Sequence, residues 1–206
     1  MIQSKEDYAF YLEADRIALS LASTVNVRRK QPRLVGDDIW KFQRLLRKAE
    51  YFHNCKKDII SRIYFRYLYY KWYKLGLKFG WLIPLNVFGP GLSISFWSGP
   101  IDVNPKATVG ENCRISHGVT IGVGPRGEGA PKLGNHIFIG PYAVIVGPIE
   151  IADDIAIGAN SYVSKSFTEP GITIAGVPAR KILDYGSERV TQKATDIARA
   201  QKLIKK

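Results

Sequence analysis

The sequence contains few cysteines and histidines, and this scarcity excludes two classes of protein. Two of its 206 residues are Cys and three are His. Cys55 and Cys113 are too few for a disulfide framework, and neither belongs to a metal-binding motif. We therefore expect a protein of a reducing compartment that holds no metal ion.

The sequence also predicts neither a membrane-spanning segment nor a signal peptide. Its most apolar stretch, residues 75–88, is interrupted by a lysine, a glycine and a proline. That stretch is too short to cross a bilayer. Residues 1–15 show no apolar run after a basic start, so we expect no secretory signal.

Positive charge is abundant and unevenly distributed. The formal net charge is +12, and residues 41–78 contain eleven Lys and Arg against only Glu50 and Asp58. Thirteen aromatic residues lie within residues 40–81. Such a segment can meet nucleic acid, an anionic glycan or a membrane surface. We favour the simpler interpretation, in which helices pack their aromatics inward and solvate their lysines. No nucleic-acid-binding motif accompanies the charge, so we predict no nucleic-acid partner.

Apolar residues before Pro84 recur at helical spacing. A first helix is predicted over residues 8–19, and a second, capped by Asp37 or Asp38, carries the apolar residues of 40–46. A third runs from about Asp58 to Phe79. Residues 25–36 are predicted to form a loop.

Every sixth residue is aliphatic in the second half of the chain. Two positions before each of these lies a second inward candidate, and the residue after each is mostly small or turn-forming. Only position 127 interrupts the series, inside the Gly- and Pro-rich stretch 122–131. The series comprises Val103, Val109, Ile115, Ile121, Leu133, Ile139, Ile145, Ile151, Ile157 and Val163.

A strict period of six predicts a hexapeptide β-helix, in which each hexad is one short strand and one turn, and three hexads close a coil. The small residues are expected because the turns are tight and often left-handed in φ. We predict a mainly β protein with three parts. These are an α-helical domain over residues 1–88, a β-helix over 89–183, and a helical tail over 184–206.

The repeat, together with the sequence AGVPAR at residues 175–180, resembles the hexapeptide acyltransferase superfamily. The likeness is to its serine acetyltransferase-like and polysaccharide O-acetyltransferase branch. It covers roughly residues 89–183. It implies left-handed coils, acetyl-CoA as co-substrate, and a homotrimer with active sites between neighbouring β-helices.

The resemblance also implies a catalytic pair. Asp102 begins the sequence DVNP and precedes His117 by fifteen residues, which is the spacing found in serine acetyltransferases. His117 then takes the proton from the acceptor hydroxyl, and Asp102 orients the imidazole. From the repeat alone, His117 follows the inward Ile115 by two positions and should point outward. The alternative is an exposed structural histidine.

A second alignment with these relatives stays open. Many of them carry the working histidine one coil earlier, where this sequence has Phe96. Either His117 serves the active site or the chain has lost its base. The retained spacing between Asp102 and His117 favours the first interpretation.

The acceptor is predicted from departures from serine acetyltransferases. Those enzymes carry an Arg-His pair before a Pro-Lys that helps to bind the serine carboxylate, but residues 128–132 here read EGAPK. Ser116 replaces an Asp of that family. A sugar hydroxyl therefore fits better than serine. We predict acceptor contacts from Ser116, Trp97 and Arg126, the last in a loop over residues 122–128.

Acetyl-CoA is expected in the groove between two β-helices. The resemblance implies that small turn residues bind the pantetheine amides and that basic residues near the end of the β-helix bind the phosphates. The matching residues are Gly140, Pro141, Ala159, Ser164, Lys165, Arg180 and Lys181.

These observations predict an acetyl-CoA-dependent O-acetyltransferase that modifies a sugar of a surface polysaccharide or its precursor. The alternatives are a serine O-acetyltransferase, an amino-sugar N-acetyltransferase and an inactive β-helix scaffold. We expect a cytoplasmic protein, and its basic helices could hold it at the inner face of a membrane.

Overall fold

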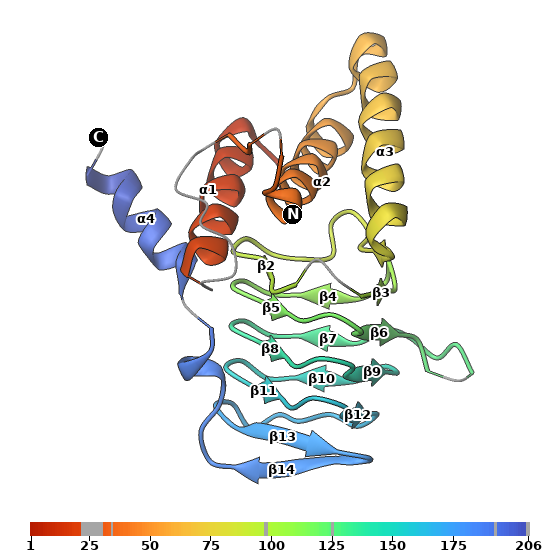
Figure 1. The fold of residues 1–206 in the computed structure, drawn as a ribbon, viewed down its shortest axis with the longest axis vertical. Coiled ribbons are helices and arrows are strands. Elements are labelled where there is room, and N and C mark those ends of the chain that lie inside the picture. Colours follow the sequence, from red (N-terminus) through yellow and green to blue (C-terminus); the bar gives the residue numbers. More distant parts are fainter. Residues whose placement is uncertain (22–30, 34, 97–98, 125, 192, 205–206) are drawn as a thin grey trace.

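A computed structural model describes residues 1–21, 31–33, 35–96, 99–124, 126–191 and 193–204. Helices α1 (Lys5–Leu21), α2 (Asp38–Cys55) and α3 (Ile59–Phe79) precede a stack of short strands, as Figure 1 shows. The predicted loop over residues 25–36 lies largely outside the described residues.

The strands of the described residues form three sheets that run along the stack. One has the order β1-β3-β6-β9-β12, one β10-β7-β4, and one β14-β13-β11-β8-β5-β2. All pairs are parallel except β13 with β14. The strands are β1 (Trp81–Leu82), β2 (Ser93–Ile94), β3 (Ile101–Val103), β4 (Thr108–Val109), β5 (Arg114–Ile115), β6 (Thr120–Gly122), β7 (Lys132–Leu133), β8 (Phe138–Ile139), β9 (Val144–Val146), β10 (Glu150–Ile151), β11 (Ala156–Ile157), β12 (Tyr162–Val163), β13 (Thr173–Gly176) and β14 (Ala179–Leu183).

The predicted fold class, a parallel β-helix behind an α-helical region, is confirmed. Each strand pairs with the strand one coil away, as Asp102 with Thr120 in the register of β3 and β6. All ten repeat aliphatics are buried, each at most 5% exposed. The second set is buried as well, and its polar member Ser161 donates its hydroxyl to the Gly158 carbonyl at 2.8 Å. The period of six therefore builds two columns of the core.

Small residues follow the repeat aliphatics for a reason other than the one predicted. Left-handed φ falls on the third residue after the aliphatic, as at Gly118 (73°), Tyr142 (58°) and Asn160 (54°). Directly after the aliphatic, successive coils approach closely. A Cβ on Gly140 would lie 2.7 Å from the Ala159 nitrogen and 2.8 Å from the Ile157 carbonyl oxygen. Close approach of backbones, not backbone conformation, excludes larger residues there.

The β-helix begins before residue 89, where the domain boundary was predicted. Strand β1 already pairs with β3, and Phe88 bridges to Val109. At the other end the tail contains a 3-10 turn, Ser187–Arg189, and helix α4 (Ala194–Ile204). The tail runs back along the stack, and α4 packs on α1 at the helical end (Figure 1), where Ala194 and Ala198 join a small apolar cluster.

The ends of the helices depart from expectation in one place. Asp58 caps α3 as its position suggests, since its side chain accepts a hydrogen bond from the Ser61 amide at 2.9 Å. Asp37 precedes α2 but does not cap it. Its φ is 53°, and its carboxylate instead accepts from the Arg33 amide. Asp38, the other predicted cap, is the first residue of α2 and pairs with Lys41.

The favoured interpretation of the basic segment required its aromatic residues to pack inward. Only some of them do. Trp40 and Phe42 of α2 are buried, and Trp72 of α3 faces the core. The opposite face of α3 exposes several tyrosines and isoleucines, among them Ile63 and Tyr70. No helix within the described residues combines the length and apolar character needed to cross a bilayer.

A buried ion cluster joins the helices to the first coil. The Arg47 guanidinium donates to Asp15 at 2.8 and 3.3 Å, to Glu50 at 3.0 Å, and to the Phe88 and Gly89 carbonyls at 2.9 and 2.7 Å. Burial lowers the pKa of Arg47, but the two carboxylates raise it above its ordinary value, so the side chain stays charged.

The two carboxylates of the cluster also accept hydrogen bonds from backbone amides at the start of the β-helix. Asp15 accepts the amides of Gly91 and Leu92 at 2.8 and 2.9 Å. Glu50 accepts the Asn86 amide at 2.8 Å. The cluster therefore links α1, α2 and residues 86–92 through ion pairs and hydrogen bonds.

Removing the arginine of the cluster should strongly destabilise the protein. We expect Arg47→Met to lower the free energy of unfolding by about 3–5 kcal/mol, because it leaves two carboxylates buried without their cation. Urea unfolding at fixed protein concentration measures this. The matched control is Arg66→Met on the exposed face of α3, which should change stability by about 0.5 kcal/mol or less. Equal stabilities for the two variants would contradict this view of the cluster.

The close approach of coils predicts a contrast between two glycines. Gly140→Ala should cost about 1–3 kcal/mol, because the new methyl meets backbone atoms of the next coil. Gly122 also follows a repeat aliphatic, but a Cβ there would meet nothing nearer than a Val146 methyl at 3.5 Å. Gly122→Ala should therefore be tolerated. Thermal unfolding of both variants tests this, and equal melting temperatures would refute it.

Candidate active site

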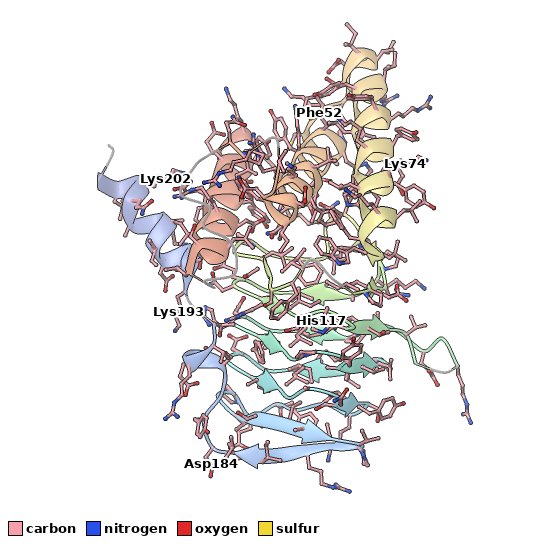
Figure 2. The ribbon with its side chains drawn as sticks, viewed as in Figure 1. Phe52, Lys74, His117, Asp184, Lys193 and Lys202 are labelled. Atoms are coloured by element: carbon pink, nitrogen blue, oxygen red, sulfur yellow. The ribbon has the colours of Figure 1, made fainter. Side chains whose placement is uncertain are left out.

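His117 lies at the corner between two sheets, in the turn that joins β5 to β6 (Figure 2). Backbone hydrogen bonds to both neighbouring coils fix this turn. The Gly118 amide donates to the Pro100 carbonyl at 2.6 Å, and the Tyr142 amide donates to the His117 carbonyl at 3.0 Å. The position of the imidazole is therefore set by the stacking of coils.

Two aromatic rings hold the imidazole from either side. Phe96 lies one coil earlier, with its ring centroid 5.4 Å from that of His117, and Tyr142 lies one coil later at 5.1 Å. Both meet it nearly edge-on, at 84° and 88°. Room for the Tyr142 ring exists because Gly118 has no side chain. A Cβ there would lie 2.6 Å from Tyr142 Cε1.

Asp102 and His117 lie on adjacent coils but are not hydrogen-bonded to each other. The Asp102 amide donates to the Val119 carbonyl at 2.9 Å, and its side chain points outward from β3 and is exposed. Nδ1 of His117 is buried and has no hydrogen-bond partner in the described part of the chain. The structure thus brings the two segments together and leaves unpartnered the nitrogen that the predicted pair would use.

The structure describes two of the three predicted acceptor residues, and they come from different segments. Ser116 is buried beside His117. Arg126 is exposed in the segment between β6 and β7, which projects from the stack (Figure 1). Its amide donates to Glu128 at 3.2 Å. Trp97 lies outside the described residues.

Three of the predicted CoA-binding residues share the corner of His117. Gly140, Pro141 and Ala159 lie on the next two coils, beyond the histidine. The Gly140 amide is used between coils, donating to Ile157 at 2.8 Å, and the Pro141 carbonyl accepts the Asn160 amide at 2.9 Å. In the described part of the chain the Ala159 amide donates to no acceptor.

The four other predicted CoA-binding residues lie elsewhere. Ser164 and Lys165 follow β12 and are exposed at another corner, where the Lys165 ammonium lies 5.3 Å from the Phe167 ring centroid. Arg180 is exposed on β14. The Lys181 ammonium already pairs with Glu169 at 2.6 Å and Asp184 at 2.7 Å. The Arg180 guanidinium is therefore more available to bind a phosphate than the Lys181 ammonium.

Of the remaining cysteine and histidine of the β-helix, Cys113 is buried and His136 is paired with a carboxylate. Burial raises the pKa of the Cys113 thiol well above its ordinary value, which argues against a nucleophile. Nδ1 of His136 lies 3.0 Å from Asp154 at a different corner. No group of three His, Cys, Asp or Glu that could hold a metal ion occurs among the described residues.

Tyr142 is the residue of this site that the sequence analysis missed. It occupies the third position after the aliphatic Ile139, the same position in the repeat as Gly118 and Asn160. These three positions all have left-handed φ. The sequence did contain a signal for Tyr142, because the neighbouring coils carry glycine and asparagine at this position of the repeat.

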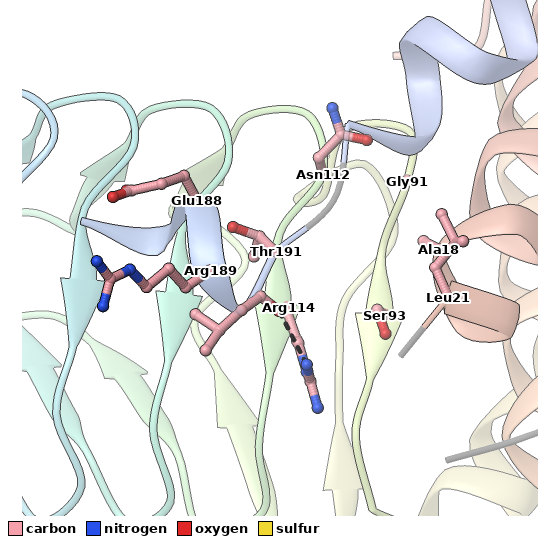
Figure 3. Close-up of a pocket in the computed structure, with 10 residues that line it drawn as sticks. Ala18, Leu21, Gly91, Ser93, Asn112, Arg114, Glu188, Arg189 and Thr191 are labelled. Carbon is pink, nitrogen blue, oxygen red and sulfur yellow. Dashed lines mark hydrogen bonds between the residues drawn. The ribbon is translucent and has the colours of Figure 1, made fainter. Parts of the chain in front are cut away.

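A separate cavity of about 260 Å³ lies between the end of α1, the sheet of β2 and β5, and the C-terminal tail (Figure 3). Its lining includes Ser93, Arg114 and Arg189. The Arg114 guanidinium is occupied by the Ser95 hydroxyl at 3.0 Å and the Val190 carbonyl at 2.8 Å. None of the predicted site residues lines this cavity.

Comparison with curated proteins finds serine acetyltransferases. The chain is 37% identical over 103 residues to that of Mycobacterium tuberculosis, covering 48% of this chain and 43% of the relative. It is 35% identical over 96 residues to that of Helicobacter pylori strain J99, covering 46% and 55%. The chain thus spans about half the length of the curated relatives it matches. No protein-family model matches the chain.

Solved structures agree over a longer part of the chain. The serine acetyltransferase of Brucella abortus strain S19 matches with a TM-score of 0.70 and 26% identity, covering 89% of this chain and 72% of that one. The Neisseria gonorrhoeae enzyme in complex with serine matches with a TM-score of 0.68 and 26% identity, covering 87% and 70%.

The chain therefore has the fold and the sequence repeat of the hexapeptide-repeat transferases. Within that class it is serine acetyltransferase-like, and the resemblance inferred from the repeat is confirmed.

Proposed function

We propose that this protein is an acetyl-CoA-dependent O-acetyltransferase with His117 as its general base. The observation that carries the proposal is the likeness to serine acetyltransferases in both sequence and fold. The corner histidine supports it independently, because its imidazole projects from the coil and has a buried, unpartnered Nδ1.

His117 and Asp102 act together in this proposal. The Asp102 carboxylate would turn toward the neighbouring coil and accept a hydrogen bond from Nδ1–H, which leaves the Nε2 lone pair free to take the proton of the acceptor hydroxyl. Asp102 would then be a positioning residue. Phe96 and Tyr142 would restrict rotation of the imidazole.

The transfer step follows from that arrangement. Nε2 of His117 removes the proton as the acceptor oxygen attacks the thioester carbonyl carbon. The tetrahedral intermediate collapses by breaking the carbon–sulfur bond, and the imidazolium returns the proton to the departing CoA thiolate. The products are the acetyl ester and CoA, and no covalent enzyme intermediate forms.

Acetyl-CoA would run along the corner beyond His117, in a groove completed by a second chain of a homotrimer. Gly140 and Pro141 present backbone without bulky side chains, and the Ala159 amide is the donor available for a pantetheine carbonyl. Arg180 is the cation we assign to the phosphates. A CoA complex of the Brucella abortus serine acetyltransferase, 25% identical with a TM-score of 0.67, supports this co-substrate.

Serine is the first acceptor to consider, because the curated relatives named above are serine acetyltransferases. A sugar hydroxyl is the second candidate, and one observation favours it. Residues 128–130 read Glu-Gly-Ala, so the segment before Pro131 and Lys132 brings a carboxylate and no cation. Arg126 is the one cation that this projecting segment offers for a carboxylate.

Removing the imidazole should abolish transfer without unfolding the protein. We expect His117→Ala to lower kcat by about 10²–10⁴-fold, because the acceptor hydroxyl loses its base. Asp102→Asn should lower kcat less and leave KM for acetyl-CoA unchanged. Release of the CoA thiol is the measurement. The control is His53→Gln, an exposed histidine of α2, which should keep full activity. Full activity of His117→Ala would refute the mechanism.

A panel of acceptors separates the two candidates. L-serine, nucleotide sugars, amino sugars and polysaccharide fragments are each mixed with acetyl-CoA, and CoA release is followed. If serine is the acceptor, Arg126→Gln should raise the KM for serine at least about tenfold, because a carboxylate loses its cation. If a neutral sugar is the acceptor, the same variant should act almost as well as the wild type. Binding of acetyl-CoA with no turnover would instead support an inactive scaffold.

A further inference from the structure

Helix α3 has two apolar faces, and the structure covers only one of them. Leu68, Trp72 and Gly76 are buried against the rest of the protein. Six large apolar or aromatic side chains of the opposite face are between 52% and 81% exposed. They are Ile59, Ile60, Ile63, Tyr67, Tyr70 and Leu77. A contiguous apolar face left exposed in this way marks an interaction surface.

The exposed apolar residues form a stripe bordered by cations. Ile59, Ile63, Tyr70 and Leu77 are spaced by four and seven residues, so they share one face of the helix. Helical geometry places Arg62 and Arg66 along one edge of this stripe, and Lys71, Lys74 and Lys78 along the other. All five cations are exposed, and α3 contains no acidic residue.

The cations lie beside aromatic rings of the same face. The Lys71 ammonium is 5.4 Å from the Tyr67 ring centroid, and that of Lys74 is 5.8 Å from the Tyr70 ring. Long basic side chains of this kind lay their stems on apolar surface and keep their charge at its border. Tyrosine rings favour the same boundary between water and hydrocarbon.

We propose that the outer face of α3, residues 59–78, binds the surface of an anionic phospholipid membrane. The stripe would enter the boundary of the acyl chains, while the five cations meet lipid phosphates on either side. Helix α3 extends away from the coils at the helical end of the molecule (Figure 1), so most of its length lies beyond the stack. The helix is about 30 Å long and would lie in the plane of the membrane.

The charge and the apolar stripe of this face favour a membrane over a second copy of the chain or an anionic polymer. A second copy packed on the same face would bring five cations against five, with no carboxylate in either helix to pair with them. An anionic polymer would satisfy the cations but would leave six apolar side chains in water. An anionic bilayer matches both the charge and the apolar stripe.

The test is cosedimentation of the full chain with sucrose-loaded vesicles. One set is pure phosphatidylcholine, and the other contains about one third phosphatidylglycerol. We expect at least about tenfold tighter binding to the anionic vesicles at low salt, weakening as salt is added. Equal binding to both sets, or none to either, would overturn the proposal.

Two triple variants test the two halves of the face. Arg66→Glu/Lys74→Glu/Lys78→Glu should weaken anionic-vesicle binding at least about tenfold. Lys106→Glu/Lys193→Glu/Lys202→Glu is the matched control, because it changes net charge equally at exposed sites outside α3. The control should lose less than about threefold. Similar losses in the two variants would mean that net charge alone drives binding, and would overturn the proposal.

The apolar stripe is tested by Ile59→Ser/Ile63→Ser/Leu77→Ser, which leaves every charge in place. Weaker vesicle binding, with helix content kept in circular dichroism, supports insertion of the stripe. Two results would overturn it. One is wild-type vesicle binding by this variant together with wild-type binding to heparin, which indicates a polyanion site. The other is a smaller assembly in sedimentation velocity, which indicates that the stripe joins copies of the chain.

Discussion

The Arg47 cluster is the interaction on which the assembly of this chain depends. All five N–H groups of one buried guanidinium are used, three toward carboxylates of the helices and two toward carbonyls at the start of the first coil. Since Asp15 and Glu50 also accept backbone amides from residues 86–92, the helical region and the β-helix share one network. A network whose members are all paired tolerates burial, whereas a partly paired one does not. The first coil thereby begins in a fixed position, and every later coil is placed on it.

The site inherits its geometry from that stack. His117, Phe96 and Tyr142 come from three successive coils, and no contact between them is set by neighbours in sequence. Their rings meet because each coil repeats the same corner. The glycine at position 118 matters equally, since any side chain there would displace the Tyr142 ring. The corner is therefore a surface built by repetition, with chemistry confined to the few residues that differ from coil to coil.

The repeat predicted the core well because a period of six reports directly which side chains point inward. It predicted the outward direction of His117 for the same reason. It could not predict that Nδ1 of His117 is buried or that Tyr142 flanks the imidazole, because such contacts join different coils and depend on where each corner turns.

The helical period likewise does not predict which of two apolar faces of a helix the rest of the protein will cover. Ile63 and Tyr70 fit a buried pattern, but α2 packs on α3 and the buried face is that of Leu68 and Trp72. Asp37 failed as a cap because its backbone turns left-handed before α2.

The segment between β6 and β7 enters and leaves the stack without altering it. Its two ends are held by ordinary coil pairing, Gly122 with Val146 and Lys132 with both Thr108 and Glu150. Residues between them can therefore change in number and kind while the corner of His117 stays in register. Chains with the same stack can therefore differ in this segment while the coils on either side of it keep the same pairing.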